Sequence, residues 1–283
     1  MKIETVGVIG AGTMGNGIAQ TFAAAGFPVI LQDLAPEALD RAHVTMQKNL
    51  GRQVKSGALT EEAATAALAR ITPTTELSAM ADRDLVIEAI VEQLEVKTAI
   101  IKQLDAICPQ TTIFASNTSS ISLTQLAAAS AHPARVIGMH FFNPVPVMKL
   151  VEIIRALQTS DEVADVIFAA TKAIGKSPRV SKDSYGFIVN RLLAPLINEA
   201  INCVNEGLAS PEDIDQMMKL GANHPMGPLS LGDLIGLDVV LNIMETLYDG
   251  FDDPKYRPSP LLKQMVSAGY LGRKAGRGFA TYG

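Results

Sequence analysis

A glycine-rich turn near the start of the chain constrains the fold more than any other feature. The run Gly10-Ala11-Gly12-Thr13-Met14-Gly15 follows an apolar, strand-like segment at 5–9 and opens a helical segment at 13–26. In such a run the first glycine permits a tight turn, the second lets a pyrophosphate approach the backbone, and the third lets the helix pack on the strand. The phosphates then bind at the helix N-terminus. The run therefore predicts a dinucleotide-binding unit.

Asp33 indicates which dinucleotide is bound. It follows the second strand-like segment, 28–32, and lies about 20 residues beyond the glycines. A carboxylate at this point accepts hydrogen bonds from the adenine ribose hydroxyls and repels a 2′-phosphate. The next residues, Leu34-Ala35-Pro36, supply no arginine for such a phosphate. We therefore predict NAD as the cofactor in preference to NADP; the alternative is that Asp33 is a solvated turn residue.

Strand-like and helical segments alternate along the first two thirds of the chain. Such alternation predicts a doubly wound, mostly parallel sheet of the Rossmann type. The predicted strands are 5–9, 28–32, 84–90, 111–116, 135–142, 149–154 and 177–181, with 71–74 as a further candidate. The predicted helices between them are 13–26, 36–55, 60–70, 93–107, 121–130 and 161–174.

From residue 184 onward the strand pattern ends. Helices are predicted at 187–201, 211–220, 230–248 and 260–268. They are too apolar for every face to contact water. We therefore expect an α/β chain of two domains. Residues 1–183 form a NAD-binding Rossmann-type domain, and residues 184–283 form an all-α substrate-binding and dimerisation domain that pairs two copies into a homodimer.

Composition excludes several classes of function. The 283 residues exceed one typical core, which favours two domains. A net charge of −5 argues against general nucleic-acid binding. Cys108 and Cys203 are too few for a disulfide framework and have no metal-ligand spacing, so we predict no metal and a reducing compartment. The chain begins directly with a strand-like run and has no apolar stretch of bilayer length, so we expect a soluble cytoplasmic protein without membrane contact.

His140 is a polar residue near the end of an apolar strand, where an apolar residue is expected. It lies in strand 135–142, and Glu152 lies in the next apolar run, 149–154. Pairing of the two runs would let the carboxylate reach the ring. An imidazole has an unperturbed pKa of about 6.5, and a carboxylate partner raises its basicity and fixes its tautomer, which suits a general base. The alternative is a core histidine that bonds a backbone carbonyl.

Two polar residues follow strands at the sheet edge where ligands of open α/β sheets bind. Ser119 comes after strand 111–116 and could donate a hydrogen bond to a substrate oxygen, or cap the next helix. Glu92 comes after strand 84–90, near the expected cofactor, and its alternative role is also a cap.

Two further features lie on helices. Asn190 interrupts the apolar helix 187–201, where a buried amide needs partners, so it is either a packing residue or a ligand contact. Lys48, Arg52 and Lys55 share one face of helix 36–55. That face is either a solvated basic stripe at the helix C-terminus or a surface for a phosphorylated ligand.

Four segments together resemble the L-3-hydroxyacyl-CoA dehydrogenase family, and the resemblance extends over the full length of the chain. They are Gly10–Gly15, Ser116-Asn-Thr-Ser-Ser120, the run Gly138–Ile154 that holds His140 and Glu152, and Gly186-Phe-Ile-Val-Asn-Arg191. The similarity is to the short bacterial members that act on 3-hydroxybutyryl-CoA. It implies NAD-dependent, reversible oxidation of (S)-3-hydroxybutyryl-CoA to acetoacetyl-CoA.

The resemblance also implies a role for each site residue. His140 matches the catalytic base, Glu152 matches its orienting partner, and Ser119 and Asn190 match contacts to the substrate near its reacting oxygens. Coenzyme A is expected to bind over the helix that carries Lys48, Arg52 and Lys55. Cofactor contacts are implied for Glu92, Lys97, Ser119, Asn143 and Lys274.

Two positions depart from the family pattern. Ala280 stands where relatives carry an aromatic residue, and Ser56 stands where a further lysine is common, which affects the expected phosphate contacts. Two other functions stay open. A different hydroxyacid dehydrogenase on the same fold would not need the basic face at 48–55. A non-catalytic NAD-binding protein would not need His140, Glu152, Ser119 and Asn190 together.

Overall fold

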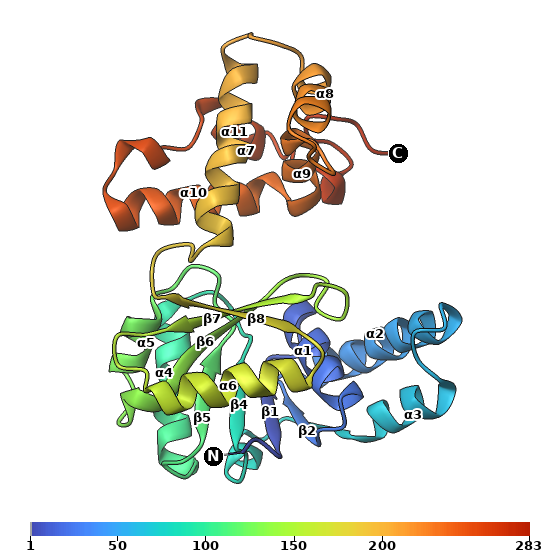
Figure 1. Ribbon diagram of the computed structural model, residues 1–283, viewed down its shortest axis with the longest axis vertical. Coiled ribbons are helices and arrows are strands. Elements are labelled where there is room, and N and C mark those ends of the chain that lie inside the picture. The colour runs from blue at the N-terminus through green and yellow to red at the C-terminus, as the bar shows by residue number, and fades with distance from the viewer. Residues whose placement is uncertain (1) are drawn as a thin grey trace. The chain divides into compact units, whose positions relative to one another are not determined.

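The computed structural model describes residues 2–283, which pack into two compact units. Within the described residues, the first unit ends at Asp183 and the second is Ser184–Gly283. The first is built from strands and helices, and the second is helical. Figure 1 shows the helices and strands of the two units.

The described part of the first unit forms one eight-stranded sheet with the strand order β3-β2-β1-β4-β5-β6-β7-β8. Neighbouring strands are parallel except β6 and β7, which are antiparallel. This confirms the predicted doubly wound, mostly parallel sheet, and each predicted strand is present. The strands are β1 (Val6–Ile9), β2 (Val29–Gln32), β3 (Ile71–Thr74), β4 (Leu85–Glu88), β5 (Ile113–Ser116), β6 (Val136–Phe141), β7 (Leu150–Arg155) and β8 (Ser177–Lys182).

Helices cover both faces of the sheet. Side chains of α1, α2 and α6 join one buried apolar cluster with β1, β2, β4, β5, β6 and β7, and Figure 1 shows α6 crossing that face. The opposite face meets α5, since a Cβ on Gly138 of β6 would lie 3.1 Å from Leu123. The helices of this unit are α1 (Thr13–Ala24), α2 (Pro36–Lys55), α3 (Glu61–Ala69), α4 (Leu94–Ile107), α5 (Leu123–Ala128) and α6 (Asp161–Ala173).

Alternation along the strands separates an apolar face from a face that carries polar groups. Successive side chains of a strand point to opposite faces. On β4, Leu85 and Ile87 belong to the buried apolar cluster, whereas Glu88 does not. On β6, Met139 and Phe141 belong to that cluster, whereas His140 projects from the other face. The polar residues of interest therefore occupy the face that α5 covers.

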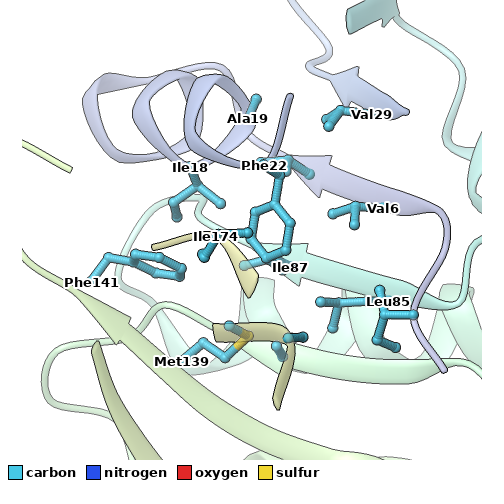
Figure 2. Close-up of a cluster of buried hydrophobic side chains, with 14 of the residues drawn as sticks. Val6, Ile18, Ala19, Phe22, Val29, Leu85, Ile87, Met139, Phe141 and Ile174 are labelled. Carbon is cyan, nitrogen blue, oxygen red and sulfur yellow. The ribbon is translucent and has the colours of Figure 1, made fainter. Parts of the chain in front are cut away.

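Phe22 is the central aromatic residue of the apolar cluster. Figure 2 shows it projecting from α1 toward Val6 and Ile87. Its side chain is fully buried, and its ring contacts the Phe27 ring edge to face at 5.6 Å between centroids. Aromatic side chains of this kind bury a large apolar area, so Phe22 holds α1 against the sheet directly behind the glycine-rich turn.

In the second unit, the prediction of one helix over 230–248 is wrong. The chain forms two helices there, and they are separated at Gly236, whose φ is +106°. The Leu237 amide donates to the carbonyl of Leu271, outside the helix, so the helical hydrogen-bond series stops at this point. The helices of this unit are α7 (Val189–Asn205), α8 (Pro211–Gly221), α9 (Pro228–Ile235), α10 (Leu237–Phe251) and α11 (Pro260–Ser267).

Across residues 2–283, no helix combines the length and the apolar character that a membrane span requires.

Replacing Phe22 with Ala should lower the free energy of unfolding of the first unit by about 3–5 kcal/mol, because it leaves a cavity between α1 and the sheet. Urea unfolding followed by circular dichroism measures the change. Leu157 is 88% exposed, so the matched control Leu157→Ala should stay within about 0.5 kcal/mol of the parent. Equal destabilisation by the two substitutions would contradict the assignment of Phe22 to the core.

Candidate active site

His140 and Glu152 form a buried pair across two strands. The antiparallel register of β6 and β7 places the two residues directly opposite one another. His140 Nδ1 lies 2.8 Å from Glu152 Oε2, and the residues are 5% and 3% exposed. The Phe142 ring packs against the imidazole, with 4.6 Å between centroids. The predicted pairing of the two strands is therefore present in the structure.

This geometry selects one tautomer of the neutral imidazole. An ionised carboxylate can accept hydrogen bonds but cannot donate them. The Nδ1 atom of His140 therefore carries the proton that it donates to Glu152. The lone pair of the neutral ring then resides on Nε2. Protonation of Nε2 gives an imidazolium that the adjacent carboxylate stabilises. The pair can therefore take up a proton at Nε2 and release it again.

The glycine-rich turn has the shape that a bound pyrophosphate requires. Gly10 has φ +98°, and a Cβ there would lie 2.6 Å from the Ala89 carbonyl oxygen of the neighbouring strand end. A Cβ on Gly15 would lie 1.7 Å from the Gly10 carbonyl oxygen, so α1 packs too closely on the turn for any side chain. A Cβ on Gly12 would meet nothing within 4 Å. Packing therefore excludes any side chain at positions 10 and 15, whereas the backbone at Gly12 faces open space.

The rest of the dinucleotide site fits the same ligand. No side chain caps the N-terminus of α1, so the first amide groups of that helix point toward the open space at Gly12. Asp33 lies just after β2, where its Oδ2 accepts from the Ala11 amide at 2.7 Å and its Oδ1 accepts from the Ala35 amide at 3.0 Å. The carboxylate is thus held beside the turn with lone pairs left for ribose hydroxyls. Thr13 and Met14 form the first turn of α1.

Glu92 organises the loop that carries Ser119. Its Oε1 accepts from the Thr118 hydroxyl at 2.6 Å, from the Ser119 amide at 2.8 Å, and from the amide and hydroxyl of Ser120, each at 3.0 Å. Burial alone would raise the pKa of Glu92, but the Lys97 ammonium and these hydrogen bonds outweigh burial and lower it. Glu92 is therefore an ionised anchor for the loop, and Ser119 lies partly exposed on it.

Lys97 and Glu88 form a buried ion pair beneath that loop. The Lys97 ammonium lies 2.6 Å from Glu88 Oε1 and 3.2 Å from Glu92 Oε2, and the lysine residue is 1% exposed. Glu88 is not among the site residues predicted from the sequence. The sequence signal that could have indicated Glu88 is its carboxylate at the end of the apolar strand Leu85–Glu88.

Asn117 is a second residue that the sequence reasoning passed over. It is 8% exposed, and its side-chain oxygen accepts from the Phe141 amide at 2.9 Å. It therefore ties the end of β5 to the strand residue that follows His140. Its place immediately after an apolar strand was the only sequence signal.

The remaining predicted residues lie in several parts of the chain. Asn143 is exposed just after β6, and Lys48, Arg52 and Lys55 are exposed along α2. Asn190 and Lys274 belong to the second unit, where Asn190 is in the first turn of α7 and the Lys274 ammonium lies 2.6 Å from Asp238 Oδ1. Within residues 2–283, the histidine, cysteine and carboxylate side chains form no cluster that could hold a metal ion.

Comparison with known proteins shows which family the chain resembles. The model of the 3-hydroxyacyl-CoA dehydrogenase NAD-binding domain matches residues 5–184, and the model of the C-terminal domain of the same family matches residues 186–282. A probable 3-hydroxybutyryl-CoA dehydrogenase of Deinococcus radiodurans is 55% identical, over 98% of this chain and 99% of that protein. A 3-hydroxyadipyl-CoA dehydrogenase of Escherichia coli is 44% identical, over 98% of this chain and 59% of that protein.

The crystal structure of (S)-3-hydroxybutyryl-CoA dehydrogenase from Ralstonia eutropha has the same fold. Its TM-score is 0.97 at 53% sequence identity, and the match covers 100% of both chains. The family models together span nearly the whole sequence, and the fold agrees over the full length. The chain therefore belongs to the 3-hydroxyacyl-CoA dehydrogenase family.

Proposed function

We propose that this protein catalyses the reversible, NAD-dependent oxidation of (S)-3-hydroxybutyryl-CoA to acetoacetyl-CoA. The 2.8 Å contact between His140 and Glu152 supports the reaction type, because it gives the buried imidazole a fixed tautomer and a carboxylate partner. Support for the substrate comes from the names of the relatives in Deinococcus radiodurans and Ralstonia eutropha.

His140 is the general base of the oxidation. Its Nε2 accepts the proton of the substrate 3-hydroxyl, while Nδ1 keeps donating to Glu152. Glu152 orients the ring and stabilises the imidazolium that forms. In the reduction of acetoacetyl-CoA, the same Nε2 returns its proton to the oxygen at C3. Low exposure of both side chains strengthens their electrostatic interaction, because little water screens it.

NAD, when bound, accepts or donates the hydride at C3 of the substrate. Residues Gly10 to Gly15 hold its pyrophosphate through the turn and the α1 N-terminus, and Asp33 accepts from the adenine ribose. Glu92 and Ser119 contact the cofactor from the neighbouring strand ends. Asn143 would contact the nicotinamide, and Lys274 is a further proposed cofactor contact.

Two groups of residues are proposed to bind the substrate. Ser119 and Asn190 bind the oxygens near the reacting carbon, and the stripe of Lys48, Arg52 and Lys55 binds the phosphates of coenzyme A. All three basic residues are exposed on one helix, which leaves them accessible to an anionic ligand.

We also propose that the protein works as a homodimer in a reducing, cytoplasmic compartment. Two apolar side chains of α7 are exposed, Leu192 at 68% and Leu196 at 37%, which supports an interface on this helix. Cys108 and Cys203 are both free thiols, which suits a reducing compartment.

Replacing His140 with Asn should reduce kcat for acetoacetyl-CoA reduction by about 10²–10⁴-fold, the usual loss when a general acid or base is removed. Oxidation of NADH, followed by absorbance, measures the rate. Binding of NADH, followed by fluorescence titration, should be unchanged, and the control His132→Asn should keep full activity. An active His140→Asn enzyme would refute the role of His140.

A parent protein that turns over 3-hydroxyadipyl-CoA far better than 3-hydroxybutyryl-CoA would move the substrate to the longer dicarboxylic acyl group.

The parent enzyme should turn over NADH faster than NADPH, because Asp33 repels a 2′-phosphate. Asp33→Asn removes the charge but keeps an oxygen that can accept from the Ala11 amide. The ratio of kcat/KM for the two cofactors should then fall by about tenfold, which corresponds to about 1.4 kcal/mol of lost repulsion. A parent enzyme that prefers NADPH would overturn the interpretation of Asp33.

Reversing charge on the α2 stripe should weaken the binding of coenzyme A. The double substitution Lys48→Glu and Arg52→Glu is expected to raise KM for acetoacetyl-CoA by about tenfold or more at low salt, with a smaller rise at high salt because surface charges are screened. KM for NADH should not change. The control Lys102→Glu reverses an exposed charge on α4 and should leave both constants unchanged. Unchanged KM for acetoacetyl-CoA in the double variant would favour a hydroxyacid substrate without coenzyme A.

A further inference from the structure

Lys97 is a charged side chain sealed inside the first unit. Its residue is 1% exposed, and its ammonium lies between two carboxylates, 2.6 Å from Glu88 Oε1 and 3.2 Å from Glu92 Oε2. A buried charge is costly unless it is paired and hydrogen-bonded. The ammonium donates to Glu88 and forms an ion pair with Glu92, and the lysine is enclosed by protein groups. A ligand that binds at the sheet edge meets Glu92 first, whose side chain is 32% exposed.

Glu88 anchors one end of this arrangement to the sheet. It is the last residue of β4, and its strand partner in β5 is Ser116. Glu88 Oε1 accepts from the Ile90 amide at 2.8 Å as well as from Lys97, and Oε2 accepts from the Ser116 hydroxyl at 2.7 Å. With both oxygens engaged by groups on the sheet and its next turn, the carboxylate is a rigid support for the Lys97 ammonium.

Glu92 connects the other end to the Ser119 loop. Its two oxygens have separate partners: Oε2 lies beside Lys97, and Oε1 accepts four hydrogen bonds from Thr118, Ser119 and Ser120. Two of these donors are the backbone amides of Ser119 and Ser120. Any rotation of the Glu92 carboxylate away from Lys97 would therefore move the backbone that presents Ser119.

We propose that Lys97 is a positioning residue, which acts through Glu92 to hold the Ser119 loop in its binding geometry, with Glu88 as its anchor. This replaces the direct cofactor contact that the family resemblance implies for Lys97. The effect on turnover rests on the proposed function, in which Ser119 and Glu92 meet cofactor and substrate. The effect on the loop does not, because the contacts are present without a ligand.

Charge balance determines what removal of Lys97 would do. Lys97 is one cause of the lowered pKa of Glu92, and the charged groups joined to this carboxylate and this ammonium in the described structure are Glu88, Glu92 and Lys97. Without the lysine, the two carboxylates face one another, so the pKa of Glu92 rises. A protonated Glu92 has less capacity to accept hydrogen bonds. The loop would then loosen as the pH falls, starting at a higher pH than in the parent.

Hydrogen exchange of the free protein tests the loop directly. In Lys97→Met, which keeps the length of the side chain, the Ser119 and Ser120 amides should exchange about tenfold faster or more, because hydrogen bonds to charged groups are strong ones. The control is Arg135→Met, which removes another buried cation that pairs with a carboxylate, Asp105. It should lower Tm but leave the protection of Ser119 and Ser120 unchanged. Unchanged protection in Lys97→Met would overturn the proposal.

A second variant covers the case in which Lys97→Met does not fold. The double variant Glu88→Gln, Lys97→Met buries no unpaired charge at Glu88, and it should fold while showing the same fast exchange at Ser119 and Ser120. Normal protection in this variant would show that the loop does not depend on Lys97.

A double-mutant cycle then separates a positioning role from a direct contact. The affinity for NADH, by fluorescence titration, and kcat/KM for acetoacetyl-CoA are measured in the parent, Lys97→Met, Glu92→Gln and the double variant. If Lys97 acts through Glu92, the lysine substitution changes both quantities about tenfold in the parent and less than about twofold once Glu92 is altered. Additive effects would overturn the proposal and support a direct contact.

The pH profile supplies a readout that lost stability alone would not change. Between neutral and acid pH, kcat/KM of Lys97→Met should decline at a higher pH than that of the parent, because Glu92 becomes protonated earlier. A parallel decline in both proteins would contradict the proposal. If the parent itself shows no turnover with acyl-CoA substrates, the proposed function fails, and the exchange rates still decide the role of Lys97.

Discussion

The reversal of one strand is the constraint on which the candidate site depends. In a sheet whose other neighbours are parallel, β7 runs antiparallel to β6, and this register brings Glu152 directly opposite His140. Residues directly opposite on neighbouring strands share a face, so ring and carboxylate need no long side chain or loop to meet. A one-residue slip of β7 would send the carboxylate to the apolar face, where burial without a partner is costly.

The same alternation places the second polar cluster. Glu88 and Ser116 are strand partners at the ends of β4 and β5, and they lie on the face opposite the core that Phe22 anchors. One face of the sheet therefore provides apolar packing, while the other carries charged groups near the strand ends. The glycine-rich turn follows β1, the neighbour of β4, so the dinucleotide site and the Glu88–Lys97–Glu92 cluster lie at the same edge of the sheet.

Much of this fold could be predicted from the sequence because each element carried its own local signal. The strands and helices of the first unit, the glycine turn and the pairing of His140 with Glu152 follow from periodicity and from polar residues in apolar runs. The break between α9 and α10 could not be predicted, since it depends on a contact between Leu237 and the distant Leu271. The Glu88–Lys97 pair could not be predicted for a related reason, because helix periodicity does not show which strand end a lysine will face.

Two buried side chains with carboxylate partners, Lys97 and His140, have different proposed roles. Lys97 lies between two carboxylates, those of Glu88 and Glu92, and these ion pairs hold its ammonium in one place. His140 pairs with the carboxylate of Glu152. That carboxylate can accept from Nδ1 whether or not Nε2 carries a proton, so the ring can keep the same position in both forms. A proposed proton-transfer group needs such an arrangement, whereas a group that only holds a loop does not. The contrast supports assigning proton transfer to His140 and positioning to Lys97.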